Sequence, residues 1–150
     1  MLRVDLSRGT VVKEALPSED VLRRFVGGNG LGVYYLLKEA PMDVVATDPR
    51  APFMIMTGPL AGTPAPSSSD WATVCFHANI PYAAGIGHGH GFWAARLKHA
   101  GYDGVRVYGQ APRPAYLWID ALGRAGRPCC PARWSRPTAT TGPAWAALAP

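Results

Sequence analysis

The chain has 150 residues, with 15 basic and 10 acidic side chains and a hydrophobic content of 48%. This length suits one ordinary domain, and the hydrophobic content excludes a chain that is disordered throughout. The sequence shows neither a secretory leader pattern nor an apolar run of about 18 residues, so we expect a cytoplasmic protein without a membrane partner. Three cysteines, an odd number, do not form a disulfide framework.

The excess positive charge is concentrated at the end of the chain. All acidic residues lie at or before Asp120, and 11 basic against 10 acidic residues give 1–120 a net charge of +1. The last 30 residues contain four arginines and no acid. We therefore divide the chain into a domain over 1–120 and an irregular Pro/Ala/Arg-rich tail over 121–150, which is either disordered or read out of frame. Because the domain is nearly neutral, we expect no nucleic-acid partner.

The first forty residues predict a β-hairpin followed by two helices. Residues 2–6 and 10–16 are the expected strands. The first helix is expected to have Ser18 as its N-cap and to stop at Gly27-Gly28, and the second is expected over 31–39. The buried stripe of the first helix is expected to consist of Val21, Leu22 and Phe25.

The following segment predicts further short strands and one more helix. The expected strands are 52–56, 71–76, 104–108 and 115–119. A helix is expected over 92–99, and two long glycine-containing loops are expected over 58–70 and 85–91. Together these elements predict an α+β fold with mixed or antiparallel sheets and short helices.

The run Gly87-His88-Gly89-His90-Gly91 is the most unusual segment. One interpretation is a fragment of a metal site, which would need a third ligand from His77, Cys75 or Asp70. The other is that the glycines let the backbone pass close to a bulky group while the imidazoles of His88 and His90 supply hydrogen bonds. The second interpretation is compatible with a cofactor pocket.

Two other polar segments are candidates for binding an anionic group. The run 28–32 opens a helix, where glycines either expose backbone amides to an anion or form a flexible turn between helices; its spacing is not that of a dinucleotide fingerprint. The loop 67–70 offers serine hydroxyls that suit oxyanions. Asp70 either accepts hydrogen bonds from a heterocycle or serves as a turn residue.

Five separated motifs then occur in an order that resembles one known family. They are LRVDL at 2–6, FVGGNGLG at 25–32, TGPLAGTPAP at 57–66, LKHAGYDG at 97–104 and PAYLWID at 114–120. Over about 1–120 the chain resembles the N-terminal domain of the aldehyde ferredoxin oxidoreductase family. The resemblance implies a platform domain under a tungsten or molybdenum bis-pterin cofactor, whose metal is held by the pterin dithiolenes and needs no protein ligand in this domain.

The resemblance also implies which loops face the cofactor. It points to 58–70 and 87–91, and in them to Ser69, Asp70, His88, Gly89, His90 and Gly91. At about Asp70 the family carries a basic residue, and at 88–91 it carries an Asn-x-Gly-Gly-like turn, so this chain differs from the family pattern at both places.

The activity implied by the resemblance is oxidation of small aldehydes to carboxylic acids, with electrons passing through a [4Fe–4S] cluster to ferredoxin. The family's cluster cysteines lie in later domains, and Cys129-Cys130 cannot replace four thiolates, so we expect no cluster ligands in this chain. We interpret the chain as the N-terminal cofactor-platform portion of such an enzyme and expect it to be inactive alone. Its expected partner is a second copy of itself or a complementing chain. The alternative is a non-enzymatic remnant or protein-interaction module that keeps the platform fold.

Overall fold

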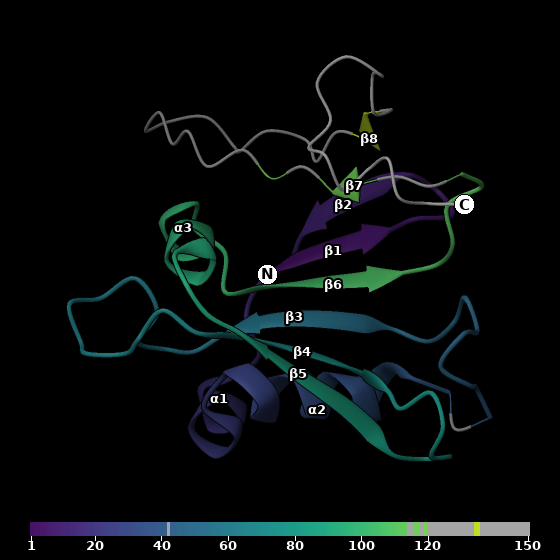
Figure 1. The fold of residues 1–150 in the computed structure, drawn as a ribbon, viewed down its shortest axis with the longest axis horizontal. Coiled ribbons are helices and arrows are strands. Elements are labelled where there is room, and N and C mark those ends of the chain that lie inside the picture. The colour runs from purple at the N-terminus through teal and green to yellow at the C-terminus, as the bar shows by residue number, and fades with distance from the viewer. Residues whose placement is uncertain (42, 114–115, 118, 120–133, 136–150) are drawn as a thin grey trace.

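The computed structural model describes residues 1–41, 43–113, 116–117, 119 and 134–135. Its centre is a six-stranded sheet in the order β2-β1-β6-β3-β4-β5 (Figure 1). The strands are β1 (Leu2–Asp5), β2 (Thr10–Lys13), β3 (Phe53–Thr57), β4 (Trp71–Phe76), β5 (Ala84–Gly89) and β6 (Gly104–Tyr108). The helices are α1 (Glu19–Phe25), α2 (Gly28–Glu39) and α3 (Trp93–His99). A separate two-stranded pair consists of β7 (Tyr116–Leu117) and β8 (Trp134–Ser135).

The strand pairing confirms the expected α+β fold with a mixed sheet. The hairpin of β1 and β2 is antiparallel, although β2 ends at Lys13 and not at residue 16. β1 also pairs in parallel with β6, which in turn pairs antiparallel with β3. The antiparallel pairs of β3 with β4 and of β4 with β5 complete the sheet. The expected strands 71–76 and 104–108 are confirmed at both ends.

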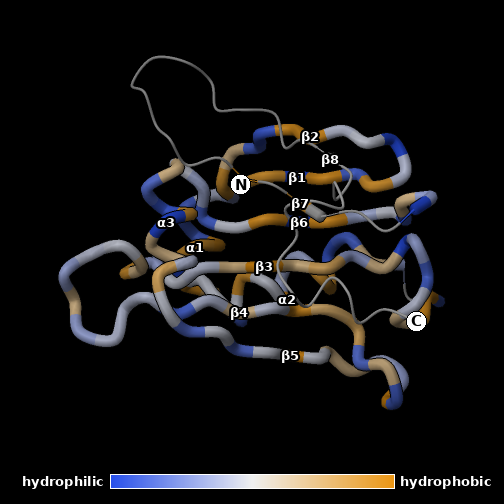
Figure 2. Tube along the Cα trace, turned by 45° about the horizontal axis from the view of Figure 1, so that its top comes forward, coloured by the Kyte–Doolittle hydropathy of each residue, from blue (hydrophilic) through white to orange (hydrophobic). Residues whose placement is uncertain are grey.

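Two hydrophobic clusters lie on opposite faces of the sheet, because neighbouring strand residues point to opposite sides. On one face, α2 packs Leu31, Tyr35 and Leu36 against Met54, Met56 and Val74 of β3 and β4, with Met1 at the margin. On the other face, Leu97 of α3 and Tyr102 pack against Leu2, Val4 and Val105. Figure 2 shows the apolar residues concentrated in the central strands, whereas β5 at the sheet edge is more polar.

The glycine run before the second predicted helix is helical, which corrects two expectations. α2 begins at Gly28, not at residue 31, and the turn between the helices is only Val26 and Gly27. A Cβ at Gly30 would lie 2.4 Å from the carbonyl oxygen of Phe25, and one at Gly32 would lie 2.6 Å from Cγ2 of Val74. These glycines therefore permit close packing of α2 on α1 and β4, and the flexible-turn interpretation is wrong.

The first helix also differs in detail from its prediction. Ser18 holds the N-cap position, but its side chain makes no capping hydrogen bond. The predicted stripe of Val21, Leu22 and Phe25 is half-buried and packs beside the α2 cluster, so α1 lies at the margin of the core.

The segment 85–91, predicted as a loop, forms most of strand β5. Its glycines make room for side chains of the neighbouring strand: a Cβ at Gly87 would lie 2.7 Å from Oγ1 of Thr73, and one at Gly89 would lie 2.2 Å from the indole of Trp71. Glycine is rare in strand interiors, and here it marks close approach by β4. The prediction failed because the glycine content reflects the strand's neighbours and not a tendency to turn.

Two further expectations concern the end of the chain and the membrane. Most of the tail 121–150 lies outside the described residues, so its predicted irregularity stays a prediction; the described part, Trp134–Ser135, pairs as β8 with β7. Within the described ranges, no helix has the length and apolar character needed to cross a bilayer.

A buried polar cluster connects the end of β2, the end of α2 and β6. The side chain of Arg106 is 3% exposed and donates hydrogen bonds to Glu14 and Glu39. The Tyr108 hydroxyl donates to Glu39. Burial is the main cause that raises the pKa of Tyr108, and this hydrogen bond raises it further, so the hydroxyl keeps its proton at neutral pH. The Tyr35 ring lies 4.3 Å from the Arg106 guanidinium carbon.

Candidate functional site

The six residues predicted to face a cofactor lie together at one end of the sheet, where β4 begins and β5 ends. Trp71 pairs with Gly89, and this register brings Asp70 beside His90. Nδ1 of His90 lies 2.8 Å from Oδ1 of Asp70, and both side chains are exposed. Ser69 precedes Asp70, whereas Gly91, with φ +94°, follows His90 and leads into α3. The carboxylate of Asp70 is thus paired with an imidazole at the surface.

His88 contacts a residue that sequence reasoning did not single out. Nδ2 of Asn29, in the first turn of α2, lies 3.2 Å from Nε2 of His88. With the amide in this orientation, its nitrogen donates to the imidazole of His88. Asn29 could have been predicted from its place in the glycine run 28–32, where the prediction rests on the backbone amides alone.

An aromatic pair covers the end of β5. The indole of Trp71 lies across Gly89, where any Cβ would meet the ring. The Trp93 ring, from the start of α3, packs on Trp71 with centroids 5.2 Å apart at 51°. The absence of a side chain at Gly89 therefore lets the Trp71 ring lie close to the strand backbone, and Trp71 in turn packs against Trp93.

This end of the sheet has hydrogen-bonding capacity that the protein itself does not use. Within the described residues, four buried side-chain polar atoms lack a partner, and three of them lie here: Oδ1 of Asn29, Oγ of Ser69 and Nε1 of Trp71. A buried polar group without a partner costs about 1–3 kcal/mol. A bound group that supplied partners would relieve that cost, so the arrangement suits a ligand with donors and acceptors.

The metal-site interpretation of the two histidines does not match the geometry. In the part of the chain that the structure describes, no three His, Cys, Asp or Glu side chains gather as a ligand set. Asp70 reaches His90, but His88 binds Asn29. His77 lies at the other end of β4, where its Nδ1 accepts from the backbone amide of Asn79 at 3.1 Å.

Cys75 is not placed as a ligand either. Its half-buried Sγ lies 3.9 Å from the carbonyl oxygen of Gly85, and burial raises the pKa of the thiol. The neutral thiol is therefore favoured, as expected for a small packing residue.

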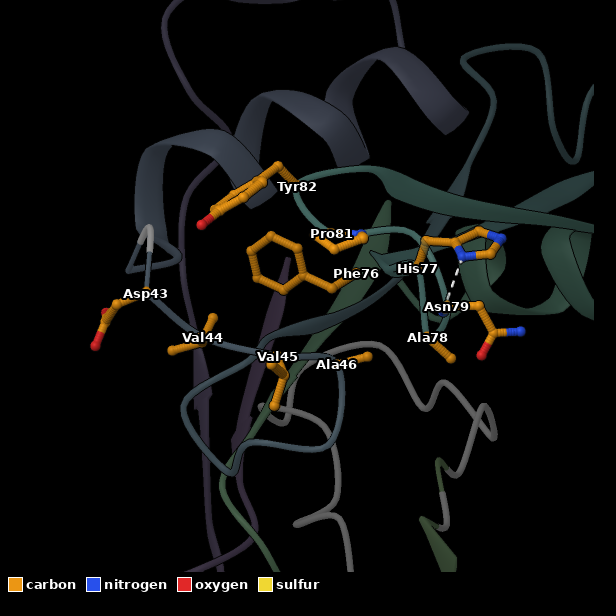
Figure 3. Close-up of a pocket in the computed structure, with 10 residues that line it drawn as sticks. All are labelled: Asp43, Val44, Val45, Ala46, Phe76, His77, Ala78, Asn79, Pro81 and Tyr82. Carbon is orange, nitrogen blue, oxygen red and sulfur yellow. Dashed lines mark hydrogen bonds between the residues drawn. The ribbon is translucent and has the colours of Figure 1, made fainter.

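Two hollows lie apart from these six residues. One, of about 170 Å³, is at the opposite end of β4, where Figure 3 shows the Phe76 ring near Tyr82 and the His77 ring pointing away from Phe76. The other, of about 540 Å³, lies beside α1 and the loop after β3, and Val26 and Pro59 are among its lining residues. None of the six predicted residues lines either hollow.

Replacing Gly89 with alanine tests how closely the site is packed. The new Cβ would lie 2.2 Å from the Trp71 ring, so we expect the indole to move and the tryptophan emission spectrum to shift. The matched control is Gly58→Ala, because a Cβ there meets nothing within 4 Å. Equal emission spectra for wild type and Gly89→Ala would contradict the described contact.

Comparison with known proteins agrees with the resemblance in the motifs. The model of the aldehyde ferredoxin oxidoreductase N-terminal domain matches residues 1–125. The tungsten-containing aldehyde ferredoxin oxidoreductase of Pyrococcus horikoshii is 35% identical over 120 residues, which are 80% of this chain and 19% of that protein. The WOR-like subunit of an aliphatic sulfonate oxidoreductase from Pyrococcus furiosus is 38% identical over 122 residues. This chain thus spans about a fifth of the length of these two relatives, 19% of each.

A solved structure has the same fold. The active-site complex BamBC of benzoyl coenzyme A reductase, solved with 1,5-dienoyl-CoA, contains a chain that superposes with a TM-score of 0.72 at 28% identity. The match covers 77% of this chain and 18% of that one.

Proposed function

Because the chain belongs to the aldehyde ferredoxin oxidoreductase family, in which it matches the N-terminal domain, we propose that it is the platform for a tungsten or molybdenum bis-pterin cofactor. The observation that carries this proposal is the set of unpartnered buried polar atoms of Asn29, Ser69 and Trp71 beside a glycine-containing strand end. A pterin offers donors and acceptors for such atoms, and the glycines allow close approach. The residues present therefore fit the group.

Each predicted residue has a role in this proposal that follows from its contacts. Gly91, where a Cβ would meet nothing within 4 Å, leaves the backbone open to a large flat group, and Gly89 makes room for the Trp71 ring beside it. His88, held by Asn29, and His90, held by Asp70, present imidazoles whose orientation is fixed by a neighbour. The Asp70 carboxylate, standing where the family has a basic residue, is partnered by His90 and does not face the cofactor as an isolated anion.

The activity proposed for the complete protein follows the family. When bound, the cofactor supplies two-electron oxidation: an aldehyde and water give a carboxylic acid, two protons and two electrons. The two electrons pass through an iron–sulfur cluster to ferredoxin. This chain's own residues bind and orient the cofactor. A [4Fe–4S] cluster uses four thiolates, and this chain has three cysteines, so the cluster would be bound elsewhere in a longer protein.

The test is cofactor loading of the purified chain. Incubated with the tungsten or molybdenum pterin cofactor and desalted, the chain is expected to retain metal in stoichiometric amounts, measured by mass spectrometry of the metal. Tyr82→Ala, an exposed position at the opposite end of β4 and β5, should load equally. We expect no aldehyde-dependent reduction of a dye, because the chain has too few cysteines to bind the iron–sulfur cluster. A folded dimer that retains no metal would overturn the platform role and support a protein-interaction module.

A further inference from the structure

Two large aromatic side chains stand exposed beside the candidate site. Phe92 is 82% exposed and Trp93 is 39% exposed, and they directly follow Gly91 at the start of α3. Neighbouring exposed aromatic rings are costly in water and mark binding surfaces more often than single apolar residues do. Their position at the strand end that carries the glycines suggests a ligand that approaches both.

The support under Trp93 shows that its ring is held in place. Trp71 packs between Gly89 and Trp93, so the three form a layer built upward from the strand backbone. A ring fixed from below offers its outer surface for stacking at little cost in side-chain entropy. Phe92, the more exposed neighbour, extends this aromatic surface.

The atoms around the layer indicate the chemistry of its ligand. Nε1 of Trp71 is a donor and Oγ of Ser69 is both donor and acceptor, and neither has a partner. A purely apolar ligand would leave both unsatisfied, whereas a flat heterocycle with nitrogen and oxygen at its edge combines a stacking face with hydrogen-bonding groups. The net charge of +1 over 1–120 does not favour a polyanion such as a nucleic acid.

We propose that Phe92 and Trp93 form a stacking surface for the heterocyclic ring of the pterin, with Trp71 as its support. This inference rests on the proposed function and adds positioning residues that lie outside the glycine loops. The carrying observation is the layered contact of Gly89, Trp71 and Trp93 next to the exposed Phe92.

The experiment uses the full chain and free pterin, which has no metal, dithiolene or phosphate. Pterin binding is measured by equilibrium dialysis, and quenching of tryptophan emission reports contact with the rings. Phe92→Ala and Trp93→Leu are each expected to weaken binding about tenfold, the size of one stacked ring. The matched control is Tyr82→Ala, because Tyr82 is 83% exposed but lies at the opposite end of β4 and β5. It should bind pterin like the wild type.

The outcomes separate this inference from the platform proposal. If wild type and both aromatic variants bind free pterin equally, or if Tyr82→Ala loses binding as they do, the stacking surface is refuted while metal loading still supports the platform. If the chain loads metal but does not bind free pterin, the stacking role is again refuted. If neither free pterin nor the complete cofactor binds, both proposals fail. Circular dichroism of each variant shows that any weakened binding comes from a folded chain.

Discussion

Replacing Arg106 with alanine is expected to lower the free energy of unfolding by about 3–5 kcal/mol, the usual cost of removing one partner from a buried ion pair. The guanidinium is almost fully buried and donates to both Glu14 and Glu39. Without it, Glu39 and the Tyr108 hydroxyl lose their neighbouring cation, Glu14 keeps only the half-exposed Arg3 at 3.6 Å, and the Tyr35 ring loses its stacked cation. Urea denaturation followed by circular dichroism measures the change.

The matched control for Arg106 is Arg23, which also pairs with a glutamate. Arg23 is bonded to Glu19 at 2.6 Å on the surface of α1, where its side chain is 77% exposed. Arg23→Ala is expected to cost about 0.3–0.5 kcal/mol, as exposed helical pairs do. Similar losses for the two variants would show that the Arg106 cluster is not a buried ion cluster in solution.

Replacing Leu36 with alanine is expected to cost about 3 kcal/mol, within the range for truncating a fully packed core leucine. Leu36 is 2% exposed and packs from α2 onto β3 and β4 in the first hydrophobic cluster. Its removal leaves a cavity between the helix and the sheet that the surrounding side chains fill only in part. The midpoint of urea denaturation is expected to fall at an unchanged slope.

The next residue provides the control for Leu36. Leu37 has the same side chain in the same helix but is 69% exposed. Leu37→Ala is expected to change stability by less than about 0.5 kcal/mol, as surface substitutions do. A larger loss for Leu37 than for Leu36 would mean that α2 presents a different face to the sheet than the structure shows.

Both predictions bear on the candidate site through α2. The Arg106 cluster holds Glu39 at the last residue of this helix, and Leu36 holds its middle on the sheet. Asn29, in the first turn of the same helix, contacts His88. Loss of either anchor is therefore expected to loosen the contact of Asn29 with His88 as well as the fold.

Most strands and helices could be predicted from the sequence because their signals are local. The segments 71–76 and 104–108 are rich in β-branched and aromatic residues, which favour a strand without knowledge of its neighbours. Two segments predicted wrongly, 28–32 and 85–91, are both rich in glycine. Position 32 of the helix is occupied by glycine because Val74 leaves no room for a side chain, and position 89 of the strand because the Trp71 ring lies over it. Those causes lie in residues distant along the chain.

The sequence predicts which segments contribute to the candidate site, but it does not predict the contacts between their residues. The six predicted residues do meet at one end of the sheet, because β4 and β5 pair in register there. The contacts of His88 with Asn29 and of Trp71 with Trp93 could not be predicted, since each joins elements whose relative placement depends on the whole sheet. That these residues hold a cofactor is our proposal, for which those contacts are the support.

The parallel pairing of β1 with β6 has a consequence for how the chain acquires its fold during synthesis. β1 begins at Leu2, yet its inner neighbour in the sheet begins far later in the chain, at Gly104. Until β6 leaves the ribosome, the early hairpin of β1 and β2 has an open edge and no central strand to join it to β3. Such distant pairing is entropically costly to close and slows folding. Nascent chains that stop before β6 are therefore expected to be the species that chaperones bind.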